Sequence, residues 1–311
     1  MKINSAKNSE ALHDLIHNCK LTPNTLVIYD VDEVLISLED KILRPCVDRD
    51  PNFKNPFYEI FYPLEDPEKT ALFGEFISQA KVVLLDPKTP EYVQSIQSKS
   101  KVIGLTRMIP GAGTCGKIKS MEEFRHNELK VLGIDFGNSF PETPFIDLSA
   151  SDKDYDEKDR KAIFKQDIIY AYPHGKDKAL GLFLDKIGFY PDQVIFVDDQ
   201  LKNLTKVAEE MEKSGIPFIG IHYQDESLSK ETFDKELGKF QYDYFIKNKI
   251  WLSDAQARKI HQKQKDSTVL FSYNQQKRRR TEVDEVREEA IKFVGSDKFL
   301  RDQERKLRHN K

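Results

Sequence analysis

Two pairs of carboxylates, each directly after a strongly apolar segment, are the chemically most informative feature of this 311-residue chain. The first pair, Asp30 and Asp32, follows the sequence Leu-Val-Ile-Tyr, and the second, Asp198 and Asp199, follows Val-Ile-Phe-Val. Such segments favour buried strands, and residues i and i+2 of a strand point to the same face. Carboxylates that share one crevice are costly unless a cation or a proton compensates their charge. The two pairs therefore indicate a magnesium-dependent site for phosphoryl chemistry.

The elements that position these carboxylates are expected to alternate between strands and helices. Strands are predicted at 25–30, 101–106, 194–197 and 216–222, with two short strands around a turn at Gln166-Asp167, and helices at 5–20, 118–132, 176–187 and 200–214. This alternation favours an α/β fold in which a doubly wound, mainly parallel sheet carries helices on both faces. In such sheets ligands bind beyond the carboxyl ends of the strands, where Asp30, Thr106 and Asp198 are all expected.

The composition divides the chain into three parts. Residues 1–36 and 101–250 are predicted to form the α/β core, residues 37–100 an inserted helical cap with X–Pro turns, and residues 251–311 a helical C-terminal extension. The stretch 258–311 carries 16 Lys and Arg against nine Asp and Glu, and it includes the basic cluster 277–280. If that cluster has a function, it binds an acidic partner, a nucleic acid or a membrane surface.

The overall composition argues against several classes of protein. A formal net charge of −3 does not indicate a general nucleic-acid-binding protein. Three distant cysteines, Cys19, Cys46 and Cys115, have no metal-ligand spacing and favour free thiols in a reducing compartment. The first residues lack the apolar core of a signal peptide, and no apolar run approaches the roughly 20 residues of a membrane span. We therefore expect a cytoplasmic protein without a transmembrane segment, although a specialised secretion signal would escape this test.

Four motifs, in order along the chain, resemble those of the haloacid dehalogenase (HAD) superfamily. They are Asp30-Val-Asp32-Glu-Val34 after a strand, Leu105-Thr106 at a strand end, Lys178 before Ala-Leu near a helix start, and Asp198-Asp199-x-x-x-Asn203 after another strand. Lys176 competes for the third position, but the residues after Lys178 fit the motif better, with Ala179 in place of the usual glycine. The resemblance covers about residues 20–225. Within the superfamily the chain is most similar to a HAD-like acid phosphatase group of poorly characterised bacterial proteins.

The resemblance implies a Rossmann-like core and a magnesium-dependent phosphatase that hydrolyses a phosphate monoester through an aspartyl-phosphate. Asp30 would be the nucleophile, and Asp32 would protonate the leaving oxygen and then deprotonate the attacking water. Thr106 would donate hydrogen bonds to the phosphoryl group, and Lys178 would offset its charge. The Mg²⁺ ligands would be Asp30, Asp32 through its main-chain carbonyl, Asp198 and Asp199.

The identity of the phosphorylated substrate does not follow from the motifs. The stretch 51–63 is rich in Phe, Tyr and Pro and lies where HAD enzymes carry a specificity cap. Tyr58 and Tyr62 are therefore candidates to contact the substrate, as are Arg107 and Asn203 beside the second and fourth motifs.

Two other interpretations of the protein's function remain open. The sequence Gly111-Ala-Gly-Thr-Cys-Gly-Lys-Ile118 nearly matches the phosphate-binding loop Gly-x4-Gly-Lys-Ser/Thr, but Ile118 replaces the hydroxyl that would bind magnesium. A P-loop NTPase is thus the weaker alternative. The chain is alternatively a non-catalytic interaction protein on a HAD scaffold that acts through its basic C-terminal helices.

Overall fold

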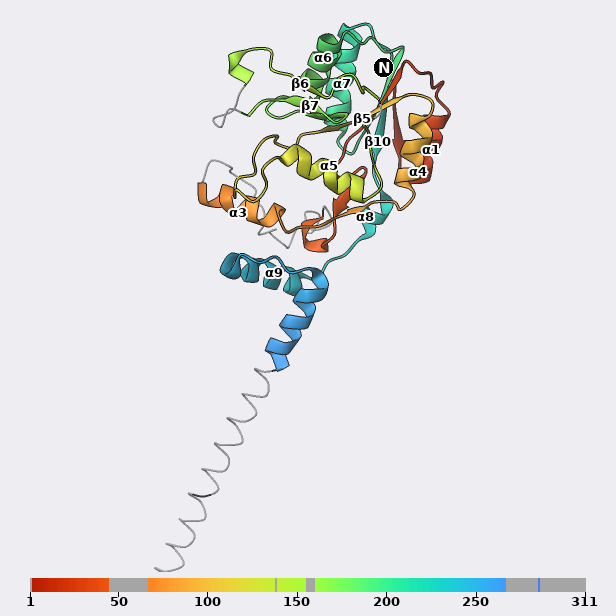
Figure 1. The fold of residues 1–311 in the computed structure, drawn as a ribbon. Coiled ribbons are helices and arrows are strands. Elements are labelled where there is room, and N and C mark those ends of the chain that lie inside the picture. The colour runs from red at the N-terminus through yellow and green to blue at the C-terminus, as the bar shows by residue number, and fades with distance from the viewer. Residues whose placement is uncertain (1, 45–66, 138, 155–159, 267–284, 286–311) are drawn as a thin grey trace, which may run out of the picture. The chain divides into compact units, whose positions relative to one another are not determined.

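The structure is a computed structural model that describes residues 2–44, 67–137, 139–154, 160–266 and 285. The chain divides into two compact units, Met1–Asp254 and Ala255–Lys311. The first unit contains an eight-stranded sheet in the order β1-β10-β9-β2-β5-β8-β7-β6. Figure 1 labels β5, β6, β7 and β10 of this sheet. Its strands are β1 (Lys2–Ala6), β2 (Thr25–Tyr29), β5 (Lys101–Thr106), β6 (Phe145–Asp147), β7 (Ile163–Lys165), β8 (Ile168–Tyr170), β9 (Gln193–Asp198) and β10 (Phe218–Tyr223).

Most neighbouring strands of this sheet run parallel. All pairs from β1 across to β8 are parallel, and only β8–β7 and β7–β6 are antiparallel. The predicted α/β class with a mainly parallel sheet is therefore confirmed. The chain runs from β2 outward to β5 and β8 and then returns to build β9 and β10 on the other side of β2. The sheet order thus reverses between β2 and β9, which is where open α/β sheets bind their ligands.

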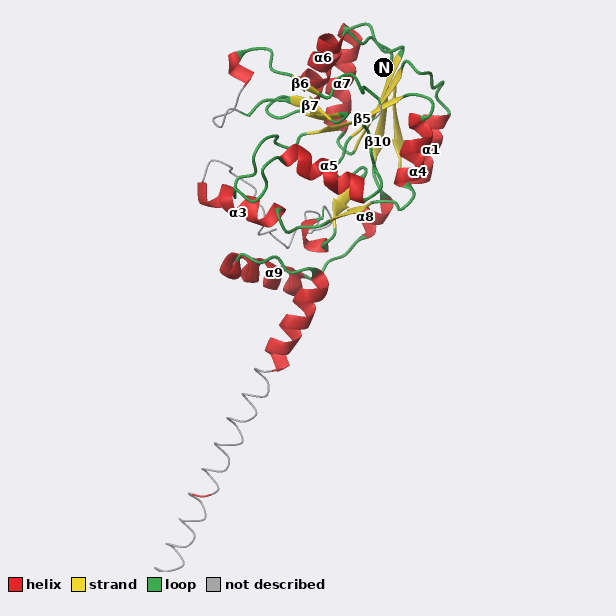
Figure 2. Ribbon diagram, in the orientation of Figure 1, coloured by secondary structure: helices red, strands yellow, loops and turns green. Residues whose placement is uncertain are grey.

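Helices cover both faces of the sheet (Figure 2). In the first unit they are α1 (Ser9–His17), α3 (Pro67–Ile77), α4 (Thr89–Gln97), α5 (Met121–Val131), α6 (Lys176–Ile187), α7 (Leu201–Lys213), α8 (Glu226–Lys230) and α9 (Lys235–Asn248), with short 3₁₀ turns η1 (Lys41–Leu43) and η2 (Asp152–Asp154). Alternate residues of β2 enter different cores: Val27 and Tyr29 pack with α1, α4 and α5, and Leu26 and Ile28 pack with α6 and α7. Burial of each such aliphatic side chain contributes about 1.5–3 kcal/mol, so β2 is fixed at the centre of the fold.

Local sequence signals explain several of the element boundaries. Ser120 caps α5 by accepting a hydrogen bond from the amide of Glu123 at 3.1 Å. The helix α6 covers the predicted range 176–187 and ends at Gly188, whose φ of 62° suits a glycine. The predicted turn at Gln166-Asp167 joins β7 to β8, and both residues have positive φ, as a tight hairpin turn requires.

The N-terminal segment differs from its prediction. Residues 2–6 form strand β1 beside β10, and the helix begins only at Ser9. The side chain of Asn8 accepts a hydrogen bond from the amide of Ala11 at 2.8 Å and so fixes this later helix start. The segment 37–100, predicted as helical, also contains strands: β3 (Ile36–Leu38) and β4 (Val82–Leu84) form a two-stranded antiparallel sheet. The run Val-Val-Leu in β4 favours a strand.

A third hydrophobic cluster joins the predicted cap segment to the end of the first unit. Ile42 and Phe76 pack there with Phe245 and Trp251. The Trp251 Nε1 donates a hydrogen bond to Asp40 Oδ2 at 2.7 Å. The helix α9, predicted as core, therefore belongs to this cluster, whereas α4, inside the predicted cap range, packs on β5.

In the second unit, residues 255–266 are helical. The basic cluster 277–280, the candidate residues Tyr58 and Tyr62, and Cys46 lie outside the described residues. Within the described part of the chain, no helix has the length and apolarity needed to cross a bilayer.

Candidate functional site

Three aspartates meet at the carboxyl end of β2 and β9. Asp30 directly follows β2, Asp198 ends β9, and the amide of Asp30 donates to the carbonyl of Val197 at 2.8 Å, which ties the two strand ends together. One carboxylate oxygen each from Asp30, Asp198 and Asp199 lies within 4.8 Å of the others. Asp30 and Asp198 are buried, and Asp199 is half-buried. Side chains from separate strands thus form one acidic cluster at the point where the sheet order reverses.

A buried lysine bridges two of these carboxylates. Lys176, the first residue of α6, places its Nζ 2.7 Å from Asp30 Oδ1 and 2.7 Å from Asp198 Oδ2. Only 3% of its side chain is exposed. The ammonium therefore neutralises part of the cluster's charge and fixes the distance between the two carboxylates.

The lysine assignment made from the sequence is thereby corrected. Lys178 lies away from the acidic cluster: its Nζ is 2.8 Å from Asp154 Oδ1, and 47% of its side chain is exposed. Two residues correspond to about 200° of helix rotation, so Lys176 and Lys178 face opposite sides of α6. Lys176 shares the buried face with Ala179 and Leu180, at the spacing of an apolar stripe. The position of a lysine on that stripe was the sequence signal for the site.

Hydrogen bonds hold the second carboxylate pair in place. The Asp198 Oδ1 accepts from the amide of Gln200 at 2.8 Å, and Asn203 Nδ2 donates to Oδ1 at 3.0 Å and Oδ2 at 3.2 Å. Asp199 Oδ2 accepts from the side chain of Gln200 at 2.7 Å. Asn203, a substrate candidate from the sequence, is therefore placed on Asp198, where it orients a carboxylate.

Asp32 belongs to a second cluster beside the first. Its Oδ2 accepts a hydrogen bond from Thr106 Oγ1 at 3.3 Å, and its Oδ1 lies 3.0 Å from Arg125 Nη2. The side chain of Asp32 is 49% exposed. Its carboxylate is thus separate from the three clustered aspartates, and metal binding through its main-chain carbonyl stays a prediction. Arg107, which follows Thr106, is exposed.

Sequence reasoning missed Arg125. This buried residue of α5 has Nε and Nη1 atoms without a hydrogen-bond partner among the described residues, although Nη1 lies 3.3 Å from Glu128 Oε2. Met121, Arg125 and Leu129 form the buried stripe of α5 at i, i+4 and i+8. As with Lys176, a cation on an otherwise apolar helix face marks the site.

The electrostatics of the acidic cluster favour a cation. Burial raises the pKa of Asp30 well above its ordinary value, although the nearby Lys176 opposes that shift. Burial also raises the pKa of Asp199, against the hydrogen bond from Gln200. For Lys176, burial disfavours the charged form, but Asp30 and Asp198 outweigh it and raise its pKa. The cluster therefore contains three carboxylates but one ammonium group, so its negative charges outnumber its positive charge.

The donor set fits Mg²⁺. Asp30, Asp198 and Asp199 offer only carboxylate oxygens, which are the ligands this ion prefers, and a divalent cation would compensate the excess negative charge.

The contacts of the loop 111–118 do not support the interpretation of this loop as a phosphate-binding P-loop. The loop's Lys117 pairs with Glu75 of α3 at 2.5 Å and is half exposed, and the hydroxyl of Thr114 donates to the carbonyl of Thr70, also in α3.

Known sequences place the chain in a family. Residues 6–258 match the family described as "Protein of unknown function (DUF2608)". The chain belongs to the DUF2608 family. Similar proteins include three chlamydial proteins whose names contain "Putative outer membrane protein". No solved structure matches this DUF2608 chain significantly.

The chlamydial proteins are distant relatives of this DUF2608 chain. The protein of Chlamydia muridarum is 27% identical over 190 residues, which is 60% of this chain and 64% of the relative. The protein of Chlamydia trachomatis serovar D is 23% identical over 161 residues, 51% of this chain and 60% of the relative. The protein of Chlamydia pneumoniae is 25% identical over 85 residues, 27% of this chain and 32% of the relative. This chain thus spans between 32% and 64% of the curated relatives that it matches.

The cytoplasmic location expected from the sequence is overturned by these relatives. All three are named as putative outer membrane proteins, and none is named as a cytoplasmic protein. The expectation rested on a missing apolar signal segment, which is a weaker basis than the names shared by several related sequences.

Proposed function

We propose that this protein is a magnesium-dependent phosphatase that hydrolyses a phosphate monoester through an aspartyl-phosphate. The observation that carries the proposal is the arrangement of Asp30, Asp198 and Asp199 around Lys176 at the switch point of the sheet. A phosphate monoester is polyanionic, so a carboxylate nucleophile approaches it only where positive charge screens the repulsion. The buried ammonium and a bound cation together would supply that charge.

Asp30 is the nucleophile in this proposal. Its Oδ1 accepts from the amide of Val31 at 2.8 Å and from Lys176 Nζ at 2.7 Å. Two donors on one oxygen fix the carboxylate's rotation, so we assign the attack on phosphorus to Oδ2. The attack forms the bond from Oδ2 to phosphorus and breaks the bond from phosphorus to the leaving oxygen. Lys176 remains beside the carboxylate and offsets the charge that gathers there.

Asp32 acts as the proton donor and acceptor. Its half-exposed carboxyl group gives a proton to the leaving oxygen and then takes one from the water that hydrolyses the aspartyl-phosphate. Thr106 at 3.3 Å and Arg125 at 3.0 Å orient this side chain. The planar fork of donors on Arg125 suits this contact with the Asp32 carboxylate.

Asp30, Asp198 and Asp199 would hold Mg²⁺, and bound Mg²⁺ would neutralise charge on the transferring phosphoryl group. The finer fold assignment belongs to this proposal as well. A HAD-like core is supported by the order β10-β9-β2-β5-β8, with carboxylates after β2 and at the end of β9, and its cap would be inserted after β2.

The test is hydrolysis of aryl phosphates with and without Mg²⁺. We expect turnover by the wild type that requires Mg²⁺, and its loss in Asp30→Asn, which keeps the size of the side chain and removes the nucleophilic oxygen. Lys178→Met is the matched control for Lys176→Met, because both remove one ammonium group from α6 and only Lys176 touches the cluster. A folded wild-type protein that hydrolyses no phosphate monoester across a broad panel would rule out the proposal.

A further inference from the structure

A buried ion pair within α5 contacts Asp32. The Arg125 Nη1 lies 3.3 Å from Glu128 Oε2, and only 9% and 15% of these two side chains are exposed. The Arg125 Nη2 lies 3.0 Å from Asp32 Oδ1. The two terminal nitrogen atoms of one guanidinium thus contact two different carboxylates, and Arg125 connects Glu128 to Asp32.

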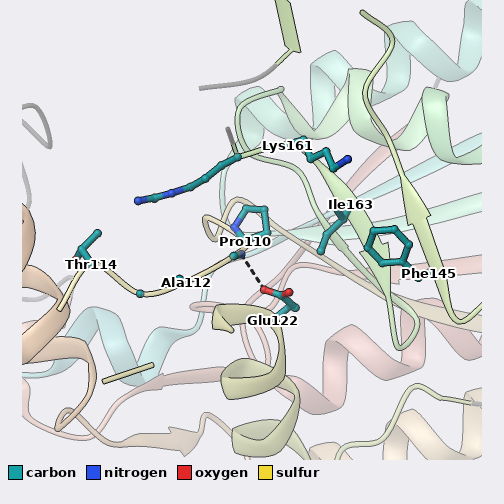
Figure 3. A pocket seen from close by; sticks show the side chains of 10 residues that line it. Pro110, Ala112, Thr114, Glu122, Phe145, Lys161 and Ile163 are labelled. Carbon is teal, nitrogen blue, oxygen red and sulfur yellow. Dashed lines mark hydrogen bonds between the residues drawn. The ribbon is translucent and has the colours of Figure 1, made fainter. Parts of the chain in front are cut away.

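The helix that carries this ion pair is fixed to the sheet. The amide of Gly111, in the loop after β5, donates to Glu122 Oε2 at 2.8 Å, as the dashed line in Figure 3 shows. The carbonyl of Gly111 accepts from the amide of Met121 at 2.7 Å. The hydroxyl of Tyr170, at the end of β8, donates to the carbonyl of Glu122 at 2.9 Å. The helix α5 therefore has a fixed position relative to Thr106, which ends β5.

Two contacts orient the carboxylate of Asp32, one on each oxygen. Thr106 Oγ1 donates to Oδ2 at 3.3 Å, and Arg125 approaches Oδ1. Because 49% of the Asp32 side chain is exposed, packing alone does not fix its rotation. A guanidinium held by one contact can turn about that contact, whereas two contacts define its plane. The contact with Glu128 therefore fixes the direction from which Arg125 meets Asp32.

Stability gives little reason for a carboxylate at position 128. Burial raises the pKa of Glu128 to about 7, although the nearby Arg125 opposes that shift. Among the described residues, no hydrogen bond reaches Glu128 Oε2. A buried ion pair is often no more stabilising than apolar residues of the same volume, because both charges lose their hydration. The orientation of Arg125 is the contribution that the Glu128 carboxylate does make.

We propose that Glu128 is a positioning residue for proton transfer by Asp32. It fixes the guanidinium of Arg125, and Arg125 in turn aims the Asp32 carboxyl group at the leaving oxygen of the phosphate ester. The inference rests on the proposed phosphatase function. The proton passes from Asp32 to the leaving oxygen as the bond from that oxygen to phosphorus breaks. Neither Arg125 nor Glu128 gains or loses a proton, and Glu128 does not contact the substrate.

Two esters of similar size test this proposal: para-nitrophenyl phosphate and para-nitrobenzyl phosphate. The nitrophenolate leaves without a proton, whereas the benzyl alkoxide needs one, and kcat/KM reports the steps up to departure of the leaving group. Glu128→Gln keeps the size of the side chain and removes its charge. Because a misplacement of about 1 Å can cost about 10²-fold in rate, kcat/KM for the benzyl ester should fall at least about tenfold and for the phenyl ester less than about twofold. Equal losses for the two esters, or no loss for either, would overturn the proposal.

A second variant and a control separate orientation from charge and from general damage. Arg125→Lys keeps the positive charge but loses the planar fork that contacts two carboxylates, so it should reproduce the selective loss for the benzyl ester. Glu123→Gln removes a carboxylate from the same helix, where it is 43% exposed and pairs with Lys165 at 2.6 Å, and should leave both esters unaffected. Urea unfolding checks that each variant is folded. An Arg125→Lys variant with the wild-type ratio of the two kcat/KM values would overturn the proposal.

A double-mutant cycle shows whether Glu128 acts through Asp32. In single turnovers of the benzyl ester with excess enzyme, Glu128→Gln should cause no further loss in the Asp32→Asn background, because that background has no carboxyl proton to place. A further loss of about tenfold in the double variant would mean an independent role and would overturn the proposal. A folded wild type that turns over neither ester refutes the phosphatase and this role with it. Turnover of both esters, with the same ratio in the wild type and Glu128→Gln, refutes only the role of Glu128.

Discussion

Replacement of Lys176 by methionine gives the sharpest test of the buried cluster. Methionine keeps the unbranched apolar stem of the side chain and removes its ammonium group. In the wild type that group lies 2.7 Å from both Asp30 and Asp198, in a position with 3% exposure. Removal of one partner from a buried ion pair costs about 3–5 kcal/mol, because the remaining charges are left uncompensated. For a unit of this size that cost lowers Tm by roughly 6–20 °C.

The assay is thermal and urea unfolding in metal-free buffer. Lys178→Met serves as the control, since Lys178 is 47% exposed and contacts Asp154 outside the cluster; it should destabilise the protein much less. The double variant Lys176→Met/Asp30→Asn should recover part of the lost stability, because it also removes one of the two unpaired carboxylates. Mg²⁺ should stabilise Lys176→Met more than the wild type, since the ion then supplies the missing positive charge.

Two results would refute this reasoning. Equal losses of stability in the Lys176→Met and Lys178→Met variants would mean that Lys176 is not buried between two carboxylates. A double variant less stable than Lys176→Met alone would mean that the carboxylates are not the source of the destabilisation.

Other predictions concern stability away from the site. Burial lowers the pKa of His13 to about 4. Between pH 6.5 and 4, His13 is therefore protonated in the unfolded chain but not in the folded protein. The wild type should lose about 3 kcal/mol of unfolding free energy between pH 6.5 and 4, and His13→Phe should lack that part of the slope in urea titrations. Gly181→Ala should stabilise α6 by about 0.5–1 kcal/mol, because its new Cβ meets only the flexible end of Glu210 at 3.0 Å. Gly74→Ala should instead lower Tm, because there the Cβ would lie 2.6 Å from the main-chain nitrogen of Cys115; a stabilised Gly74→Ala would contradict the packing of the loop on α3.

Much of the sheet could be predicted because its strands are buried on both faces. The segments that became β2, β5 and β9 are continuous apolar runs, which is the pattern of parallel central strands. Once the sheet was expected to be parallel, the strand ends placed Asp30, Thr106 and Asp198 at one edge. The structure brings Asp30 and Asp198 together as that argument requires.

The choice of lysine could not be made from the motif alone. The residues after Lys178 resemble the superfamily's motif, but the apolar stripe of α6 decides which lysine enters the core. The burial of Arg125 was not predicted for a related reason, since most other residues of α5 are charged or polar and only the i, i+4 spacing with Met121 and Leu129 indicates it.

Local sequence patterns do not predict contacts between segments that are far apart in the sequence. The sequence of β1 is mostly polar and does not by itself predict a strand. The segment is a strand because it pairs with β10 at the edge of the sheet. The pairing of Trp251 with Asp40 joins residues 211 positions apart, and neither position carries a local signal for the other. Such contacts depend on the assembled fold, so sequence periodicity does not contain them.

The most direct test of the central claim is to look for a phosphoryl group on Asp30. The wild type is mixed with an aryl phosphate and Mg²⁺, quenched in acid within the first turnovers, digested, and analysed by mass spectrometry. The proposed chemistry predicts added phosphate on the peptide that contains Asp30, and its absence from Asp30→Asn. Steady turnover with no modified Asp30 peptide, or with the phosphate on another residue, would contradict it.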